Sequence, residues 1–257
     1  MQLSPSIFKA YDIRGIIDQT LDASVAFSLG QAFGSQMIDL GESVIAVGRD
    51  GRLSGPELLE ALTRGLLSTG IDVIDLGMVA TPMVYFAANQ TINGQNPKSG
   101  IMITGSHNPP NYNGFKMVLG GAAIYGEKIQ GLYQQIQNKS FKQGQGQRSQ
   151  FDIFPMYLQR IVSDVHLARP MKITIDCGNG VGGAFAAQLF RALGCEVEEL
   201  FCEVDGNFPN HHPDPAHLEN LQDLIQNLTQ TTSELGLAFD GDADRLGVVT
   251  KNGEVIF

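Results

Sequence analysis

The first half of the chain alternates apolar runs of strand length with amphipathic stretches of helical length. Strands are predicted at residues 44–47, 73–76, 100–104 and 114–118. Helices are predicted at residues 55–68, after Thr81 and Pro82, and at 127–138. Strands that alternate with helices predict a mixed or parallel sheet that helices cover on both faces.

The stretch 139–150, KSFKQGQGQRSQ, interrupts this alternation because it is polar, rich in glycine and glutamine, and free of aliphatic side chains. Beyond it, helices are predicted at residues 156–165, from the loop 178–183 to about 193, and at 218–228. Strands are predicted at residues 172–176, 196–201, 235–239, 246–250 and 254–257, the last two joined by an Asn-Gly hairpin. We therefore expect an α/β protein with two consecutive mixed or parallel-sheet domains, residues 1–150 and 151–257.

Composition narrows the class of protein. Hydrophobic residues make up 43% of the 257 residues and charged residues 17%, which allows a packed core. The formal net charge of −10 argues against nucleic acid or an anionic membrane as a partner. The sequence has neither an apolar run of about 18 residues nor a recognisable signal peptide. Cys177, Cys195 and Cys202 form no CxxC pair and are expected to be reduced, as in a cytoplasmic protein.

A loop with a hydroxyl, an imidazole and an amide follows the predicted strand at residues 100–104. Its sequence from Thr104 is TGSHNPP. A Ser-His hydrolytic dyad is disfavoured because adjacent side chains of an extended segment point to opposite sides, and no GxSxG elbow surrounds Ser106. Two interpretations remain, a structural turn and a hydroxyl that accepts and returns a phosphoryl group. The second needs cations around the phosphate oxygens, and Lys116 could supply one.

Three carboxylates alternate with small residues in the segment DGDADR. Asp240, Asp242 and Asp244 can converge from one side of an extended loop, and hard carboxylate oxygens suit Mg²⁺ or Ca²⁺ better than zinc. Their mutual repulsion predicts a bound cation or a basic partner. An EF-hand does not fit, because Arg245 would stand where that loop needs glycine and the flanking segments are predicted strands.

Three further segments have a structural and a functional interpretation. Residues 178–183, GNGVGG, satisfy the GxGxxG pattern of dinucleotide-binding loops, with the acidic residue Glu198 downstream at the expected spacing. A single match of this kind also arises from tight packing of a strand-to-helix turn. The segment VGRDGR at 47–52 predicts a salt-bridged turn, and the adjacent His211 and His212 predict loop structure rather than a metal site.

Five segments together resemble the α-D-phosphohexomutase family, which includes phosphomannomutases and phosphoglucomutases. They occur in the usual order of that family and extend over nearly the whole chain. The segments are FKAYDIRG at 8–15, VGRDGRLSG at 47–55, GIMITGSHNPPNYNGFKM at 100–117, DCGNGVGG at 176–183 and AFDGDADRLGVV at 238–249. The combination of TGSHNP with DGDADR is highly specific.

The resemblance implies a mechanism. Ser106 would be the phosphoserine, and Asp240, Asp242 and Asp244 would hold Mg²⁺ with a phosphoserine oxygen as a further ligand. The implied reaction is the reversible transfer of phosphate between the C1 and C6 oxygens of a hexose. A hexose phosphate and a hexose 1,6-bisphosphate are the expected partners. Arg14 and Lys116 would assist proton transfer and charge neutralisation, and the phosphoryl-transfer site would be lined by Arg14, His107, Asn108, Lys116 and Arg245.

Members of this family have four domains, and the chain resembles the first two. The loops of the third and fourth domains that read the sugar and clamp the second phosphate have no counterpart, so we expect a truncated half with little or no turnover. Two other classes stay open, a noncatalytic Mg²⁺-binding or interaction module and a dinucleotide-binding module. The motifs favour the phosphomannomutase/phosphoglucomutase subgroup without choosing the hexose.

Overall fold

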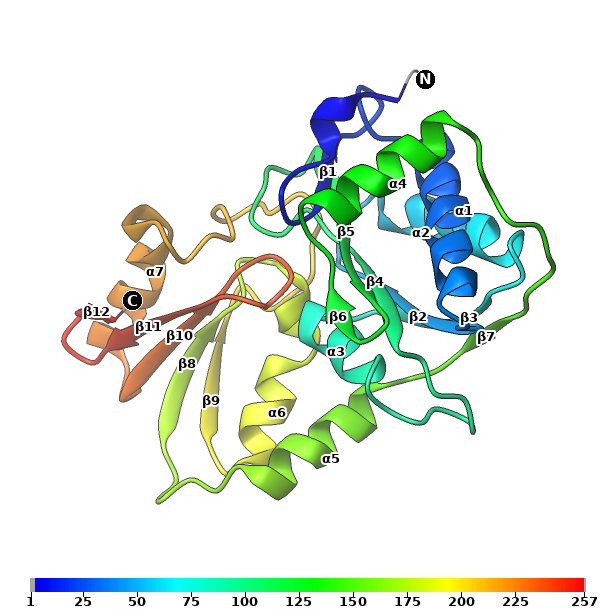
Figure 1. Ribbon diagram of the computed structural model, residues 1–257. Coiled ribbons are helices and arrows are strands. Elements are labelled where there is room, and N and C mark those ends of the chain that lie inside the picture. Colours follow the sequence, from blue (N-terminus) through cyan, green and yellow to red (C-terminus); the bar gives the residue numbers. More distant parts are fainter. Residues whose placement is uncertain (1–2, 257) are drawn as a thin grey trace. The chain divides into compact units, whose positions relative to one another are not determined.

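The computed structural model describes residues 3–256, and the chain divides into two compact units. The units are Met1–Ile153 and Phe154–Phe257. Each unit has its own sheet and its own hydrophobic core, so each is described separately (Figure 1).

A seven-stranded mixed sheet forms the centre of the first unit. Its strands are β1 (Ile13–Ile16), β2 (Val44–Arg49), β3 (Asp72–Met78), β4 (Ser99–Ile103), β5 (Tyr112–Leu119), β6 (Ala122–Ala123) and β7 (Arg148–Gln150). Their order is β1-β5-β4-β2-β3-β7, and β6 pairs with β5. Strands β4, β2, β3 and β7 are parallel, whereas β5 is antiparallel to both β4 and β1. The carboxyl ends of β2 and β4 therefore meet at one edge of the sheet.

Helices cover both faces of this sheet because its side chains alternate between the faces. Ile45 and Val47 of β2 point into a core shared with three of the helices, whereas Gly48 lies against Val84 of the other. The three helices on the first face are α1 (Ala23–Asp39), α2 (Gly55–Leu67) and α4 (Glu127–Gln137). The opposite helix is α3 (Thr81–Ala87), and a 3-10 turn, η1 (Pro5–Ile7), precedes β1.

The second unit repeats this arrangement with a five-stranded sheet of order β12-β11-β10-β8-β9. Its strands are β8 (Lys172–Asp176), β9 (Glu196–Leu200), β10 (Leu235–Phe239), β11 (Leu246–Thr250) and β12 (Val255–Ile256). The parallel strands β9, β8 and β10 are followed by the antiparallel β11 and β12. The helical elements are α5 (Phe154–Asp164), η2 (Val181–Ala184), α6 (Ala186–Ala192), η3 (Leu218–Leu221) and α7 (Gln222–Gln230).

Two small cores lie on the two faces of the second sheet. Leu237 packs in the cluster that contains Ala186 and Ala187 of α6. Its neighbour Ala238 packs in the cluster that contains Leu224 and Leu228 of α7. The successive residues of β10 thus face different helices, and the predicted α/β fold class with mixed sheets is confirmed.

Some elements differ from those predicted. Helix α1 and strand β1 lie in a part of the chain for which no element was predicted. Residues 148–150, placed in the polar break, form β7 and pair with β3. The helix predicted at 218–228 begins as η3 and becomes α-helical only at Gln222. Phe257, the last residue of the predicted final strand, lies outside the described residues.

Candidate functional site

The first part of the candidate site is the loop that follows β4. Gly105 leaves the sheet, and Ser106 adopts the left-handed conformation with φ of 50°. This conformation is uncommon for a residue with a side chain and persists only where the surroundings hold it. The Ser106 side chain is buried, and its Oγ lies 3.3 Å from Nδ1 of His107. The hydroxyl and the imidazole predicted from the motif therefore lie within hydrogen-bond reach of each other.

A chain of buried hydrogen bonds connects this loop to the end of β2. The hydroxyl of Thr104 donates to Oδ2 of Asp50 at 2.7 Å. The same hydroxyl oxygen accepts the backbone N–H of Ser106 at 2.7 Å. Asn108 closes the turn by donating from Nδ2 and from its backbone N–H to the carbonyl of Gly105. The conformation of the loop is thus fixed by side chains on both strands.

The predicted salt-bridged turn after β2 is confirmed, and it is buried. Nε of Arg52 lies 3.3 Å from Oδ2 of Asp50, and the side chains are 0% and 1% exposed. The backbone N–H of Arg52 also donates to Asp50 Oδ1 at 3.0 Å. The guanidinium of Arg52 also binds residues more than fifty positions away along the chain. The local motif gives no indication of these contacts.

Two predicted cationic residues lie on neighbouring strands of the same sheet. Arg14 of β1 is paired with Gly114 of β5, and Lys116 is two positions further along β5. Directly opposed residues and residues two apart share one face of a sheet, so Arg14 and Lys116 lie on the same face. Arg14 Nη2 lies 2.5 Å from Oδ2 of Asp12. The first unit thus contains five of the predicted site residues: Arg14, Ser106, His107, Asn108 and Lys116.

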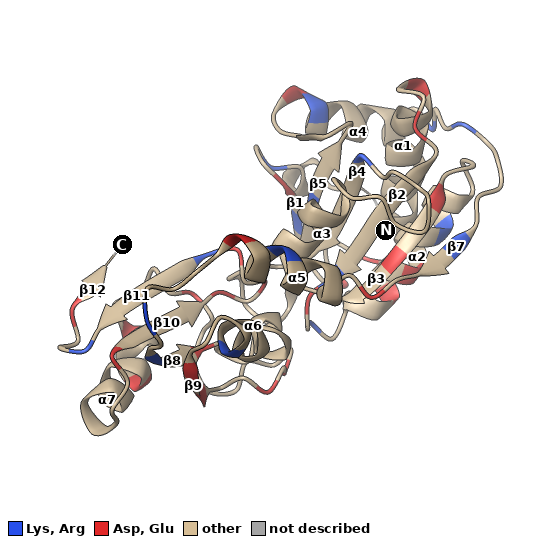
Figure 2. Cartoon of the chain, turned by 90° about the horizontal axis from the view of Figure 1, so that it is seen from below, with Lys and Arg blue, Asp and Glu red and all other residues tan. Residues whose placement is uncertain are grey.

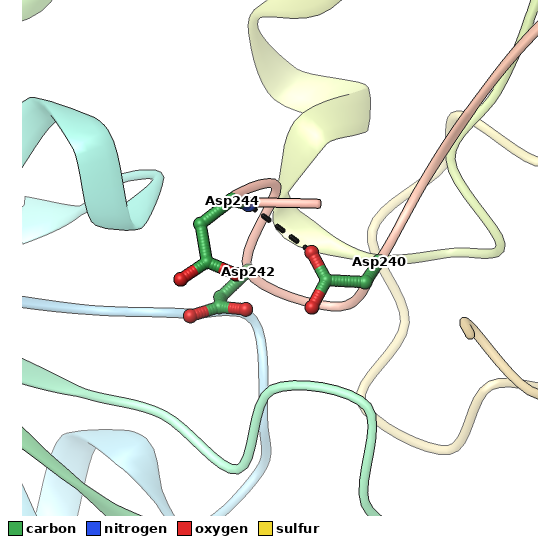
Figure 3. Close-up of side chains that lie close together, drawn as sticks. All are labelled: Asp240, Asp242 and Asp244. Carbon is green, nitrogen blue, oxygen red and sulfur yellow. Dashed lines mark hydrogen bonds between the residues drawn. The ribbon is translucent and has the colours of Figure 1, made fainter. Parts of the chain in front are cut away.

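The second part of the candidate site is the loop between β10 and β11. The side chains of Asp240, Asp242 and Asp244 turn toward one another (Figure 3), and one carboxylate oxygen from each lies within 4.8 Å of the others. Asp240 and Asp242 are buried, whereas Asp244 is exposed. The predicted convergence of the three carboxylates is therefore present.

The backbone of this loop orients Asp240. Its Oδ1 accepts the N–H of Asp244 and the N–H of Arg245, each at 3.1 Å, and the first of these bonds is drawn in Figure 3. Ala243 has φ of 58°, which lets the chain reverse direction within the loop. The loop presents its carboxylates while the exposed Arg245 starts the return into β11.

The donor set of this loop suits a hard divalent cation. Carboxylate oxygens are preferred ligands of Mg²⁺ and Ca²⁺. Ligands at about 2.1 Å from one octahedral Mg²⁺ are about 3 to 4.2 Å apart, which is comparable with the spacing of these carboxylate oxygens. Among residues 3–256, these three aspartates form the one group of at least three acidic, histidine or cysteine side chains close enough together to hold a metal ion.

The glycine-rich loop 178–183 packs against the chain itself. A Cβ on Gly183 would lie 2.0 Å from the carbonyl oxygen of Cys202, and one on Gly180 would lie 2.9 Å from Cα of Gly241. The backbone N–H of Val181 donates to the carbonyl of Gly241. Gly180 is needed where the loop approaches the acidic loop, and Gly183 is needed where it approaches Cys202, so packing accounts for the GxGxxG pattern without a dinucleotide.

A buried pair that sequence analysis did not predict lies at the end of β8. Nε2 of His211 lies 3.0 and 3.1 Å from the two carboxylate oxygens of Asp176, and Nδ1 lies 3.0 Å from the carbonyl of His212. Burial alone lowers the pKa of His211, but the hydrogen bond and charge of Asp176 outweigh it and hold that pKa above its usual range. The segment 211–212 lies in a loop, as predicted, and this pair joins it to the end of β8.

Charge is distributed unevenly in the second unit (Figure 2). Glu196, Glu198 and Glu199 make β9 acidic, and α7 carries Asp223 near its start. Because the chain as a whole has a net charge of −10, an anionic ligand needs local cations to bind. Within the described part of the chain, no helix combines the length and the apolar composition that crossing a bilayer requires.

Both units match domains of one protein family. Residues 5–143 match the domain "Phosphoglucomutase/phosphomannomutase, alpha/beta/alpha domain I", and residues 155–253 match "alpha/beta/alpha domain II" of the same family. The two matches together span most of the chain, which therefore has the first two domains of a sugar-phosphate mutase family. The chain belongs to the phosphoglucomutase/phosphomannomutase family.

Individual relatives agree with this assignment. A phosphomannomutase/phosphoglucomutase of Pseudomonas aeruginosa is 54% identical over 255 residues, covering 99% of this chain and 54% of the relative. A phosphoglucomutase of Neisseria gonorrhoeae is 56% identical over 257 residues, covering 99% and 55%. The crystal structure of a phosphoglucomutase/phosphomannomutase family protein from Burkholderia thailandensis superposes with a TM-score of 0.98 at 58% identity, covering 100% and 57%. The chain spans about half the length of these relatives.

Proposed function

We propose that the chain carries the phosphoryl-transfer centre of a phosphohexomutase. The reaction is the reversible transfer of phosphate between the C1 and C6 oxygens of a hexose through a 1,6-bisphosphate. The observation that carries the proposal is the buried Ser106 turn, in which a left-handed serine is held beside His107 by the hydroxyl of Thr104, itself bound to Asp50. Membership of the mutase family and the acidic loop support it.

In this proposal Ser106 is the phosphoryl carrier. As the Oγ–phosphorus bond forms, the bond from phosphorus to the sugar oxygen breaks, the serine proton is lost and the sugar oxygen gains one. Arg14 and Lys116, which share a sheet face, would neutralise the transferred phosphate and assist these proton movements. His107 and Asn108 would hold the serine and its loop, and Arg245 would add a cation from the second unit.

We propose Mg²⁺ as the metal of the acidic loop. Asp240, Asp242 and Asp244 would hold it, and a phosphoserine oxygen on Ser106 would be the further ligand. When bound, the ion would draw negative charge from the phosphoryl oxygens as charge develops on them. The backbone N–H groups that bind Asp240 would keep its second oxygen available to the ion.

Hexose phosphates are the proposed substrates, with glucose and mannose phosphates as the first choice. Relatives above 50% identity bear the names phosphomannomutase/phosphoglucomutase and phosphoglucomutase. We propose that the Ser106 loop and the acidic loop belong to two successive domains, residues 1–150 and 151–257. Cys177, Cys195 and Cys202 are free thiols, which suits a reducing compartment, and we propose the cytoplasm.

The test is phosphoryl uptake from glucose 1,6-bisphosphate in the presence of Mg²⁺. Intact mass should show one phosphoryl group gained, and peptide fragmentation should place it on Ser106. Ser106→Ala should gain none. Ser68→Ala is the matched control, because it removes another hydroxyl of the first unit, one that donates to the carbonyl of Gly65 and accepts from Nε2 of Gln31. A phosphoryl group on any other residue, or none on the wild-type chain, would contradict the proposal.

A further inference from the structure

The guanidinium of Arg52 is the centre of the Ser106 loop. Its Nη2 donates to the carbonyls of Ser106 at 2.8 Å and Asn108 at 2.6 Å. Its Nη1 donates to the carbonyls of Pro109 at 2.6 Å and Tyr112 at 2.9 Å. One buried side chain thus binds four carbonyl groups of the segment that contains the proposed nucleophile.

The position of the guanidinium is itself fixed from the other side. Asp50 binds the backbone N–H of Arg52 through Oδ1 and lies 3.3 Å from its Nε through Oδ2. The same Oδ2 accepts the hydroxyl of Thr104, which in turn binds the N–H of Ser106. Asp50 therefore holds both the guanidinium and the peptide at the start of the loop.

The loop is shaped to fit this guanidinium. A Cβ on Gly105 would lie 2.4 Å from Cζ of Arg52 and 2.5 Å from its Nε, so only glycine allows the peptide to pass across it. The next residue, Ser106, has φ of 50°, a conformation that is strained for a serine and needs support from its surroundings. The hydrogen bond from Arg52 to the Ser106 carbonyl acts directly on that strained residue.

We propose that Arg52 is the positioning residue of the Ser106 loop. It does not itself touch the transferred group. It holds the carbonyls of residues 106, 108, 109 and 112 so that Ser106 keeps the left-handed conformation in which its Oγ is presented for phosphoryl transfer. This inference rests on the proposed function of Ser106, and it assigns to the buried arginine control over the rate of phosphoryl uptake.

Only a planar, multidentate donor fits this position. The guanidinium offers five N–H donors in a rigid fork, whereas the ammonium of lysine offers three donors from a single point. Lysine keeps the charge that pairs with Asp50 but cannot reach four carbonyls at once. Arg52→Lys should therefore release part of the loop while preserving the buried charge.

The experiment compares Arg52→Lys with Leu62→Ala, a variant that destabilises the same unit at a distance from the loop. Leu62→Ala removes a buried side chain of α2 and lowers the stability of the same unit without altering the loop. The rate of Ser106 phosphorylation is measured against the concentration of glucose 1,6-bisphosphate with saturating Mg²⁺. Arg52→Lys should lower the maximal rate about 10- to 100-fold, because a small displacement of a reacting group has this effect. The donor concentration for half-maximal rate should change little.

A second measurement reports on the loop itself. Amide hydrogen exchange of residues 104–113 should be faster in Arg52→Lys than in Leu62→Ala at equal global stability. Gly105→Ala keeps the guanidinium but displaces it, and it should show the same two effects. If Arg52→Lys does not fold, Gly105→Ala takes its place in both measurements.

The outcomes separate the inference from the function on which it rests. A wild-type chain that gains no phosphate would overturn the proposed function, and the role of Arg52 in it. A phosphorylated wild type whose arginine and glycine variants keep the Leu62→Ala rate would overturn the positioning role alone. Slower uptake together with faster exchange confined to residues 104–113 would support it.

Discussion

Buried charged side chains in this protein are held by several hydrogen bonds each. Asp75 accepts the backbone N–H of Gly77 and pairs with Arg148. Asp176 accepts the N–H of Gly178 and binds His211. Asp75 lies in the middle of β3 and joins it to β7, whereas Asp176 is the last residue of β8. Because a buried charge is stable only when it is paired and hydrogen-bonded, the first contact fixes the edge strand β7 and the second fixes the loop that follows β8.

The His211 pair makes the stability of the second unit depend on pH. A carboxylate and a carbonyl only accept hydrogen bonds, so contacts from both ring nitrogens require a doubly protonated imidazole. The pKa of His211 is raised by Asp176, so the stabilisation is complete below the unfolded pKa and is lost as pH rises through the folded pKa. His211→Asn should therefore lower the free energy of unfolding more at about pH 5.5 than at about pH 8.5.

Urea unfolding at the two pH values measures this difference. The control is His166→Asn, which removes an exposed histidine of the same unit and should change the free energy of unfolding equally little at both. An effect of His211→Asn that is independent of pH would show that folding does not raise the pKa of His211.

At the scale of elements, the first unit depends on the close packing of α1 on α2. A Cβ on Gly65 would lie 2.1 Å from the carbonyl of Phe27, and one on Gly30 would lie 2.3 Å from the carbonyl of Leu62. The two helices therefore approach backbone to backbone where these glycines face each other. Side chains that fill the rest of this contact, such as Phe33 and Leu62, are fully buried.

Gly65→Ala should destabilise the first unit. The added methyl group meets backbone atoms, which cannot move aside as a side chain can, so we expect a loss of about 1–3 kcal/mol or more in the free energy of unfolding. Gly131→Ala is the matched control, because Gly131 lies in the exposed part of α4 with nothing near its Cβ position. It should stabilise the protein by about 0.5–1 kcal/mol through helix propensity. The unfolding temperatures of both variants measure this difference. A Gly65→Ala variant as stable as the wild type would contradict the close backbone contact.

The elements that sequence analysis predicted correctly have apolar runs with clear boundaries. Strands β10 and β11 begin and end at the predicted residues, because acidic and turn-forming residues flank them. Helix α1 was not predicted, since its glycines and serines have low helix propensity and it is stabilised by packing on α2. Strand β7 was not predicted either, because Arg-Ser-Gln carries no apolar pattern and pairs with β3 through its backbone.

In the candidate site, too, features within one motif were predicted and contacts between distant segments were not. Motifs within a few residues predicted the Ser106 loop and the convergence of the three aspartates. The contacts of Arg52 with residues 106–112 and of His211 with Asp176 join segments far apart in sequence. Local patterns do not encode such pairs, and only the fold brings them together. Asp50 and Arg52, two charged residues that closely follow a buried strand, were the available signal for the first of them.

At the scale of the whole chain, the proposed chemistry is divided between the two units. The first unit contains the proposed nucleophile, whereas the acidic loop belongs to the second unit by itself. A cation that binds the three aspartates should therefore stabilise the second unit without any sugar phosphate. This expectation distinguishes metal binding from phosphoryl transfer, because it requires only the residues of one loop.

Mg²⁺ should accordingly raise the stability of the second unit, by about 1.4 kcal/mol at a concentration tenfold above its Kd. Amide exchange of residues 235–250 should slow on addition of Mg²⁺, while exchange of the Ser106 loop should change less. Asp242→Asn should abolish the effect, because it removes one buried carboxylate of the three. Asp223→Asn is the matched control, since it removes an exposed carboxylate of α7 with the same change of charge and should leave the effect intact. Equal stabilisation of wild type and Asp242→Asn would mean that Mg²⁺ binds elsewhere, and the acidic loop would then need a basic partner rather than a metal to offset its charge.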